Sequence, residues 1–112
     1  MLNFILCDDN PYILSSISKF LDIIFIKNNI DAQLVFSSSN WEDILSFTKN
    51  NSVDVAILDI ELKSTKTGVD IANELRKDNK DLYIIFLTRT YGLHISSIKN
   101  KNIRLFVKAN SY

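Results

Sequence analysis

Cysteine, proline, glycine and histidine are all scarce here: the 112 residues include one cysteine, one proline, two glycines and one histidine. A single cysteine excludes an internal disulfide and argues against a metal site built from cysteines. We expect Cys7, which lies within an apolar run, to be a buried and unreactive thiol. His94 has no pattern of metal ligands or catalytic partners around it, and we expect it on the surface of a helix.

Neither sign of charge is in excess, because Lys and Arg total 13 and Asp and Glu total 13. The chain therefore lacks the net positive charge that draws a protein to nucleic acid or to an anionic membrane. The apolar patch Phe20 to Ile26 contains Asp22 and is far too short to span a bilayer. The N-terminus has no basic region of a secretion signal. These absences predict a soluble, cytoplasmic protein that contacts no membrane, and the length of 112 residues predicts a single domain.

The clearest element is the almost unbroken apolar run from Val53 to Ile60. Such a run is typical of a strand that is buried on both faces of a parallel sheet. Asp59 lies near its carboxyl end. A carboxylate in that position costs free energy unless something pairs with it, so a partner is expected nearby.

Apolar runs alternate with helical periodicities along the rest of the chain. Strands are expected over residues 4–7, 32–36, 53–60, 83–87 and 103–107. Helices are expected over residues 11 to about 27, 41 to about 49, 68–77 and, from a weaker pattern, 91–102. This alternation predicts an α/β fold, a doubly wound five-stranded parallel sheet with helices on both faces. The common strand order for such sheets is 2-1-3-4-5.

In that order, four adjacent strands end in side chains that can do chemistry: Asp8-Asp9, Asp59, Thr88 and Lys108. Carboxylates that meet at one edge repel each other unless they share a cation. An oxygen-only ligand set favours a hard ion, Mg²⁺ ahead of Ca²⁺. With the ammonium of Lys108 and the hydroxyl of Thr88, such a site can bind a phosphoryl group while a carboxylate attacks phosphorus. Asp59 is the natural nucleophile, and Asp8 and Asp9 are the natural metal ligands.

Five short motifs resemble the receiver (CheY-like) domain of bacterial two-component response regulators, over residues 3–108. They are Cys7-Asp8-Asp9, Leu58-Asp59-Ile60, Gly68-Val69-Asp70, Leu87-Thr88 and Val107-Lys108. The resemblance implies a flavodoxin-like receiver fold for residues 1–112, with Asp59 as the acceptor of a phosphoryl group from a sensor histidine kinase. It also implies a Mg²⁺ site formed by Asp8, Asp9, Asp59 and the main-chain carbonyl of Glu61. Thr88 and Lys108 would contact the aspartyl phosphate. Such a domain catalyses its own phosphorylation and dephosphorylation, and it is not an enzyme with a separate substrate.

The loop from Ile60 to Gly68 has no proline at Lys63 and is one residue longer than in many receivers. In this it resembles the accessory gene regulator branch, in which a LytTR DNA-binding domain follows the receiver. That branch implies a transcriptional output, with DNA contacted only through an output domain that this sequence does not contain. A receiver also continues into a fifth helix, for which Tyr112 leaves no room. We therefore expect an uncovered apolar sheet face that favours association, as a homodimer, or gives poor solubility.

Three positions depart from the family's pattern. Arg89 stands where a small residue is common, Leu105 where a switch aromatic is usual, and Ala109 where proline is frequent. Arg89, Leu105 and the missing fifth helix support an alternative, a pseudo-receiver that acts as a protein-interaction module and is never phosphorylated. The retention of all five site residues argues against it. A second alternative is a small Mg²⁺-dependent phosphohydrolase. The adjacent Asp8 and Asp9, in place of an Asp-x-Asp pair, and the lack of a cap domain argue against it.

Overall fold

The computed structural model describes residues 1–60, 66–88 and 103–107, and for Thr88 and residues 103–107 it describes the backbone only. In chain order the elements are β1 (Leu2–Cys7), α1 (Pro11–Lys27), β2 (Ala32–Ser38), α2 (Trp41–Asn50), β3 (Val55–Asp59), α3 (Gly68–Asp78), β4 (Tyr83–Thr88) and β5 (Ile103–Val107). The helix expected over residues 91–102 lies outside the described residues.

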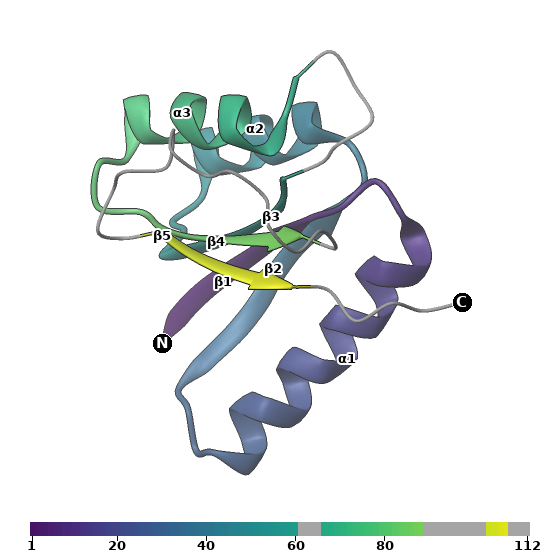
Figure 1. The fold of residues 1–112 in the computed structure, drawn as a ribbon. Coiled ribbons are helices and arrows are strands. Elements are labelled where there is room, and N and C mark those ends of the chain that lie inside the picture. Colours follow the sequence, from purple (N-terminus) through teal and green to yellow (C-terminus); the bar gives the residue numbers. More distant parts are fainter. Residues whose placement is uncertain (61–65, 89–102, 108–112) are drawn as a thin grey trace.

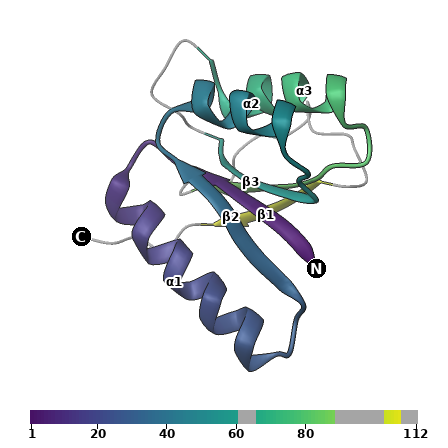
Figure 2. The ribbon, with the colours of Figure 1, turned by 180° about the vertical axis from the view of Figure 1, so that it is seen from behind.

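The five strands lie in one sheet, in the order β2-β1-β3-β4-β5. Every neighbouring pair is parallel. This confirms the predicted doubly wound sheet and its order. Figures 1 and 2 show α1 on one face of the sheet and α2 and α3 on the other. Because the strands are parallel, their carboxyl ends all lie at one edge, where ligands bind in sheets of this kind.

The central strand β3 is buried at every residue, as its apolar run predicted. Ala56 and Leu58 pack in the core that lies against α2 and α3. Val55 and Ile57 pack in the second core, against α1. The strand is shorter than the predicted 53–60, starting two residues later and ending one residue earlier, which is the usual uncertainty of element ends.

Each of the three described helices begins with a side-chain cap at the edge where the strands end, and two of these caps follow β1 and β3. The amide oxygen of Asn10 accepts hydrogen bonds from two backbone N–H groups of the first turn of α1, at 2.9 and 3.3 Å. Pro11 takes the first helical position, where its missing N–H costs nothing. At the start of α3, the Thr67 hydroxyl accepts from the Asp70 N–H at 3.2 Å and the Asp70 carboxylate accepts from the Thr67 N–H at 2.9 Å. The caps thus set where the loops after β1 and β3 end.

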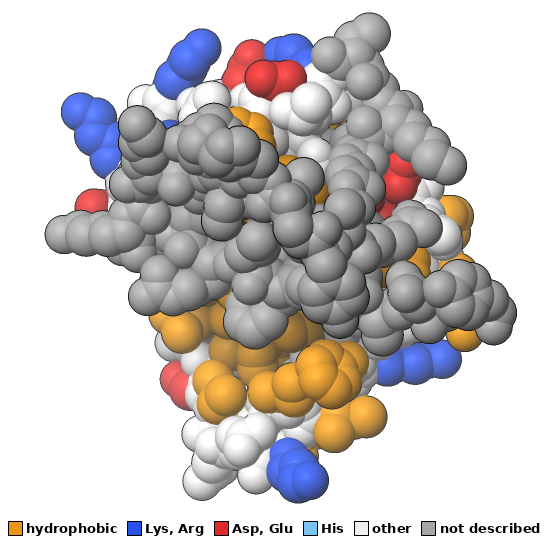
Figure 3. All heavy atoms as spheres, viewed as in Figure 1, with side chains coloured by type: hydrophobic (Ala, Val, Ile, Leu, Met, Phe, Trp, Pro, Cys, Tyr) orange, Lys and Arg blue, Asp and Glu red, His pale blue; other side chains and the backbone are white. Residues whose placement is uncertain are grey.

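The second half of α1 exposes large apolar side chains. Phe20 and Ile23 are each 60% exposed, and Ile26 is 80% exposed. Figure 3 shows hydrophobic side chains gathered over this helix, below the atoms drawn in grey. Exposed apolar patches often mark contact surfaces, and the homodimer expected from the sequence stays a prediction. None of the helices within residues 1–60 and 66–88 is long and apolar enough to span a membrane.

Candidate metal centre

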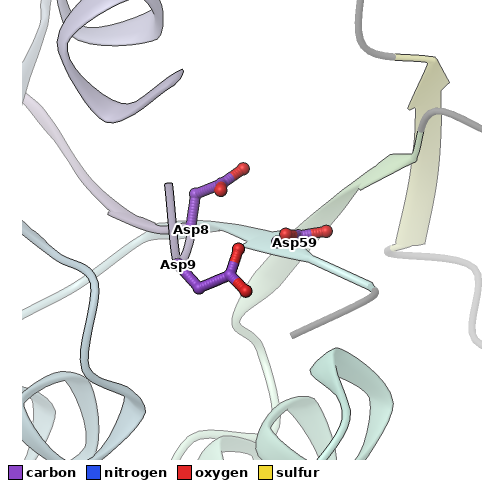
Figure 4. A group of neighbouring side chains, drawn as sticks. All are labelled: Asp8, Asp9 and Asp59. Carbon is purple, nitrogen blue, oxygen red and sulfur yellow. The ribbon is translucent and has the colours of Figure 1, made fainter. Parts of the chain in front are cut away.

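Three aspartates meet at the edge of the sheet where the strands end. Asp8 and Asp9 directly follow β1, and Asp59 is the last residue of β3. The register of these neighbouring strands pairs Cys7 with Leu58, so that Asp8 and Asp59 come next on adjacent strands. Figure 4 shows the three side chains next to one another. One carboxylate oxygen from each lies within 4.8 Å of the others. The structure thus brings together the three acids that the sequence singled out.

Two of the three aspartates are buried in the protein. The exposed fraction is 0% for Asp8 and 1% for Asp59, whereas Asp9 is partly exposed. The Asp8 carboxylate accepts a hydrogen bond from the backbone N–H of Asn10 at 3.0 Å, so the residue that caps α1 also orients this acid. Carboxylates buried this close together repel each other and lose their hydration. A cation shared among them offsets both costs.

The donor set of the cluster fits a hard divalent cation. All the ligand atoms that it offers are carboxylate oxygens, which favour Mg²⁺ or Ca²⁺ over zinc or copper. Mg²⁺ keeps several waters and needs only one or two protein carboxylates, which suits a cluster at the edge of a sheet. Asp8, Asp9 and Asp59 therefore fit the Mg²⁺ expected from the sequence.

Cys7 lies immediately beside this cluster and is fully buried, as predicted. Burial, and then the negative charges of Asp8, Asp59 and Asp9, raise the pKa of the Cys7 thiol to about 12. The thiol is therefore protonated throughout the neutral range. Only the thiolate form of cysteine is a strong nucleophile or metal ligand. The protonated Cys7 is therefore a poor metal ligand, and the candidate metal centre consists of oxygen ligands.

We expect Cys7 to resist alkylation by iodoacetamide at pH 8 in the native protein, because the thiol is both buried and protonated. After unfolding in guanidinium, the same thiol should react fully, which mass spectrometry would count as one adduct per chain. The variant Ser16→Cys, at an exposed position on α1, is the control and should gain one adduct in the native state. Rapid alkylation of native Cys7 would contradict its burial.

The backbone that follows Asp59 is held at both ends of a short loop. The N–H of Ile60 donates to the carbonyl of Leu87 at 3.1 Å, and the N–H of Gly68 donates to the carbonyl of Ile60 at 3.3 Å. Gly68 lies so close to β3 that a Cβ added to it would be 2.2 Å from the carbonyl oxygen of Asp59. The start of α3 therefore packs directly against the backbone of Asp59, and this contact explains the glycine.

Of the other predicted site residues, the structure describes only the backbone of Thr88. Thr88 ends β4, next to β3, in which Asp59 pairs with Leu87, so its backbone lies beside the acids. Its side chain is not among those that the structure describes. Lys108 directly follows β5 and Glu61 directly follows Ile60, and both lie outside the described residues. The roles of Thr88, Lys108 and Glu61 stay predictions.

A further group of side chains near this loop was not identified from the sequence. Lys66 lies at the end of the loop that follows Asp59, and it contacts Glu74 of α3 and Trp41 of α2. These contacts join three separate segments of the chain. No local pattern marks such a contact, so the sequence contains no signal that would have found it.

Comparison with known proteins agrees with this geometry. The family model of the response regulator receiver domain matches residues 4–102. No curated protein sequence matches the chain. Among solved structures, the response regulator TrrA of Thermotoga maritima, in complex with Mg²⁺-BeF, is 25% identical with a TM-score of 0.76, over 97% of this chain and 88% of that one. A receiver domain protein of Clostridium thermocellum is 25% identical with a TM-score of 0.78, over 99% and 85% of the two chains.

A third structure shows the same fold in a longer protein. RcsB of Salmonella enterica serovar Typhimurium, bound to the rprA promoter in the presence of BeF₃⁻, is 20% identical with a TM-score of 0.77. This chain aligns over 99% of its own length and covers 62% of RcsB. The fold, the carboxylate cluster and the match over residues 4–102 lead to one assignment. The chain belongs to the family of response regulator receiver domains.

Proposed function

We propose that this receiver is a phosphoacceptor, in which Asp59 takes a phosphoryl group from a sensor histidine kinase with Mg²⁺ as the cofactor. The observation that carries the proposal is the convergence of Asp8, Asp9 and Asp59, with carboxylate oxygens within 4.8 Å of one another. The Mg²⁺-BeF complex of the Thermotoga maritima relative supports it. The family match over residues 4–102 supports it as well.

The acids divide into a nucleophile and metal ligands by their places in the sheet. Asp59 ends the central strand and is 1% exposed, so its backbone is firmly held and its carboxylate lies at the middle of the edge. Asp8 and Asp9 come from the adjacent strand β1. In the proposal these two hold Mg²⁺ together with Asp59 and the main-chain carbonyl of Glu61. When bound, Mg²⁺ neutralises charge on the phosphoryl oxygens.

Phosphoryl transfer to Asp59 is a displacement at phosphorus. A carboxylate oxygen of Asp59 attacks, the new O–P bond forms, and the bond from phosphorus to the nitrogen of the donor histidine breaks, with its electron pair going to that nitrogen. Thr88 is proposed to donate its hydroxyl to a phosphoryl oxygen, and Lys108 to add a positive charge. Burial of Asp59 and Asp8 excludes bulk water from one side of the reacting carboxylate.

We also propose that phosphorylation switches a transcriptional output. RcsB, whose structure resembles this chain over 62% of its length, was solved bound to a promoter. In the proposal, DNA contact belongs to an output domain outside these 112 residues, and the resemblance of the loop Ile60–Gly68 to the LytTR branch names the kind of domain expected.

The experiment that tests the proposal is intact mass spectrometry after incubation with acetyl phosphate, with and without Mg²⁺. Wild type should gain one phosphoryl adduct only when Mg²⁺ is present. Asp59→Asn should gain none, because the nucleophile is missing. Asp81→Asn is the matched control, since it removes an exposed aspartate between α3 and β4 and should behave as wild type.

Two results would overturn the proposal. No adduct on folded wild type would leave the pseudo-receiver, a binding module without phosphorylation, as the better explanation. Hydrolysis of acetyl phosphate that persists in Asp59→Asn would instead point to a phosphohydrolase with another nucleophile.

A further inference from the structure

Asn10 takes part in two sets of hydrogen bonds at the start of α1. Its side-chain oxygen accepts from the backbone N–H groups of Tyr12 and Ile13, at 2.9 and 3.3 Å. Its own backbone N–H donates to Oδ1 of Asp8 at 3.0 Å. The same residue therefore caps the helix and holds a carboxylate oxygen of an acid that is fully buried in the cluster.

The backbone conformation of Asn10 is restricted from two sides. The residue before a proline is driven to extended backbone, and Asn10, which precedes Pro11, has φ −100° and ψ 112°. The two hydrogen bonds that its side chain accepts tie this conformation to the first turn of α1. Because Asn10 is held in this way, the direction of its N–H group is held as well, and with it the hydrogen bond to Asp8.

Asp8 is also held from the other side, by the neighbouring strand. Its backbone N–H donates to the carbonyl of Ser38, the last residue of β2, at 3.4 Å. With its backbone tied to β2 and one carboxylate oxygen held by the N–H of Asn10, the carboxylate of Asp8 is oriented before a cation binds. Ligands that are already in place bind more tightly, because less order has to be imposed on them when the complex forms.

We infer that Asn10 is a positioning residue for the Mg²⁺ site, because its cap on α1 fixes the N–H group that orients Asp8 as a metal ligand. The inference rests on the proposed function, since Mg²⁺ binding by the carboxylates of Asp8, Asp9 and Asp59 is what the fixed orientation favours. Residues that orient a metal ligand in this way change the affinity for the metal without touching it. The side chain of Asn10 is uncharged, so its replacement by another uncharged residue leaves the net charge around the cation unchanged.

Asn40 provides a matched control, because it makes the same kinds of hydrogen bond at the start of α2. Its side-chain oxygen accepts from the N–H of Glu42 at 2.9 Å, and its φ of −112° and ψ of 116° are close to those of Asn10. Its own N–H also donates to a side chain two residues earlier, at 3.0 Å, but that acceptor is the hydroxyl of Ser38 and not an acid of the cluster. Loss of the Asn40 side chain therefore removes a helix cap without releasing a metal ligand.

The experiment is a Mg²⁺ titration of the full chain by isothermal titration calorimetry. Asn10→Ala should bind Mg²⁺ about tenfold more weakly than wild type, whereas Asn40→Ala should bind it with wild-type affinity. Asn10→Ser should restore most of the affinity, because a serine hydroxyl also caps a helix. Thermal unfolding without Mg²⁺ checks that each variant is folded, and both alanine variants should unfold at a lower temperature than wild type because each lacks a cap.

The outcomes distinguish this inference from the proposed function. If Asn10→Ala binds Mg²⁺ as tightly as wild type, or if Asn40→Ala loses as much affinity as Asn10→Ala, the positioning role is overturned while the proposed function stands. The same holds if Asn10→Ser binds as weakly as Asn10→Ala, because the cap then does not orient Asp8. If folded wild type binds no Mg²⁺, the proposed function fails and this inference fails with it. If Asn10→Ala is unfolded, Asn10→Gly decides, because glycine begins a helix at little cost, and wild-type affinity in that variant would overturn the positioning role.

Discussion

Replacing Gly68 by alanine is expected to lower the free energy of unfolding by about 3 kcal/mol, at the upper end of the cost of overpacking a well-packed site. The added Cβ would lie 2.2 Å from the carbonyl oxygen of Asp59 and 2.8 Å from Cα of Ile60. Both atoms belong to the backbone, so no side chain can turn aside to make room. The start of α3 would have to move away from β3, and the hydrogen bond from Gly68 to the carbonyl of Ile60 would be strained or lost.

Urea denaturation of wild type and Gly68→Ala measures this loss. Asn73→Ala, at an exposed position on the same helix, is the control and should stay within about 0.5 kcal/mol of wild type. Because the displaced backbone is that of Asp59, the affinity of Gly68→Ala for Mg²⁺ should fall as well. If Gly68→Ala is as stable as wild type, the start of α3 can move away from the central strand without loss of stability. The close contact then does not require glycine.

The fold could be predicted from the sequence because each main element has a strong local cause. The apolar run around Ile57 is typical of a strand in the centre of a parallel sheet, and it is buried on both faces. The pair Asn10-Pro11 starts a helix for reasons that hold in any protein, and α1 begins there. The strand order then follows from the general rules for parallel sheets with helical crossovers.

The carboxylate cluster could be predicted for a related reason. Once β1 and β3 are adjacent and parallel, residues that end them must lie at one edge, and the register places Asp8 beside Asp59. The contact of Lys66 with Trp41 could not be predicted in this way, because it depends on how α2 and α3 pack together on the sheet. Local propensity and periodicity contain no information about that packing. The roles of Thr88, Lys108 and Glu61 stay predictions, since the Thr88 side chain and the whole of Lys108 and Glu61 lie outside the described part of the chain.

Without divalent metal, Asp59→Asn is expected to be more stable than wild type by about 1–2 kcal/mol. Asp8 and Asp59 are 0% and 1% exposed, and with Asp9 they bring carboxylate oxygens within 4.8 Å of one another. Asparagine has nearly the same shape as aspartate but no charge, so the substitution removes repulsion without opening a cavity. A site that evolved to hold a cation is thus expected to cost stability when the cation is removed.

Saturating Mg²⁺ should reverse this order. A ligand that binds only the native state stabilises it by about 2.7 kcal/mol at one hundred times its dissociation constant. Wild type should receive more of this gain than Asp59→Asn, in which Asp8 and Asp9 are the only carboxylates left in the cluster. Urea denaturation in EDTA and in excess Mg²⁺ measures the free energy of unfolding without and with the metal. Asp81→Asn is the control and should follow wild type under both conditions. If Asp59→Asn is less stable than wild type in EDTA, repulsion among the three carboxylates is not the main effect of this cluster on stability. If Mg²⁺ stabilises wild type and Asp59→Asn equally, the cation binds without Asp59, and Asp59 is not one of its ligands.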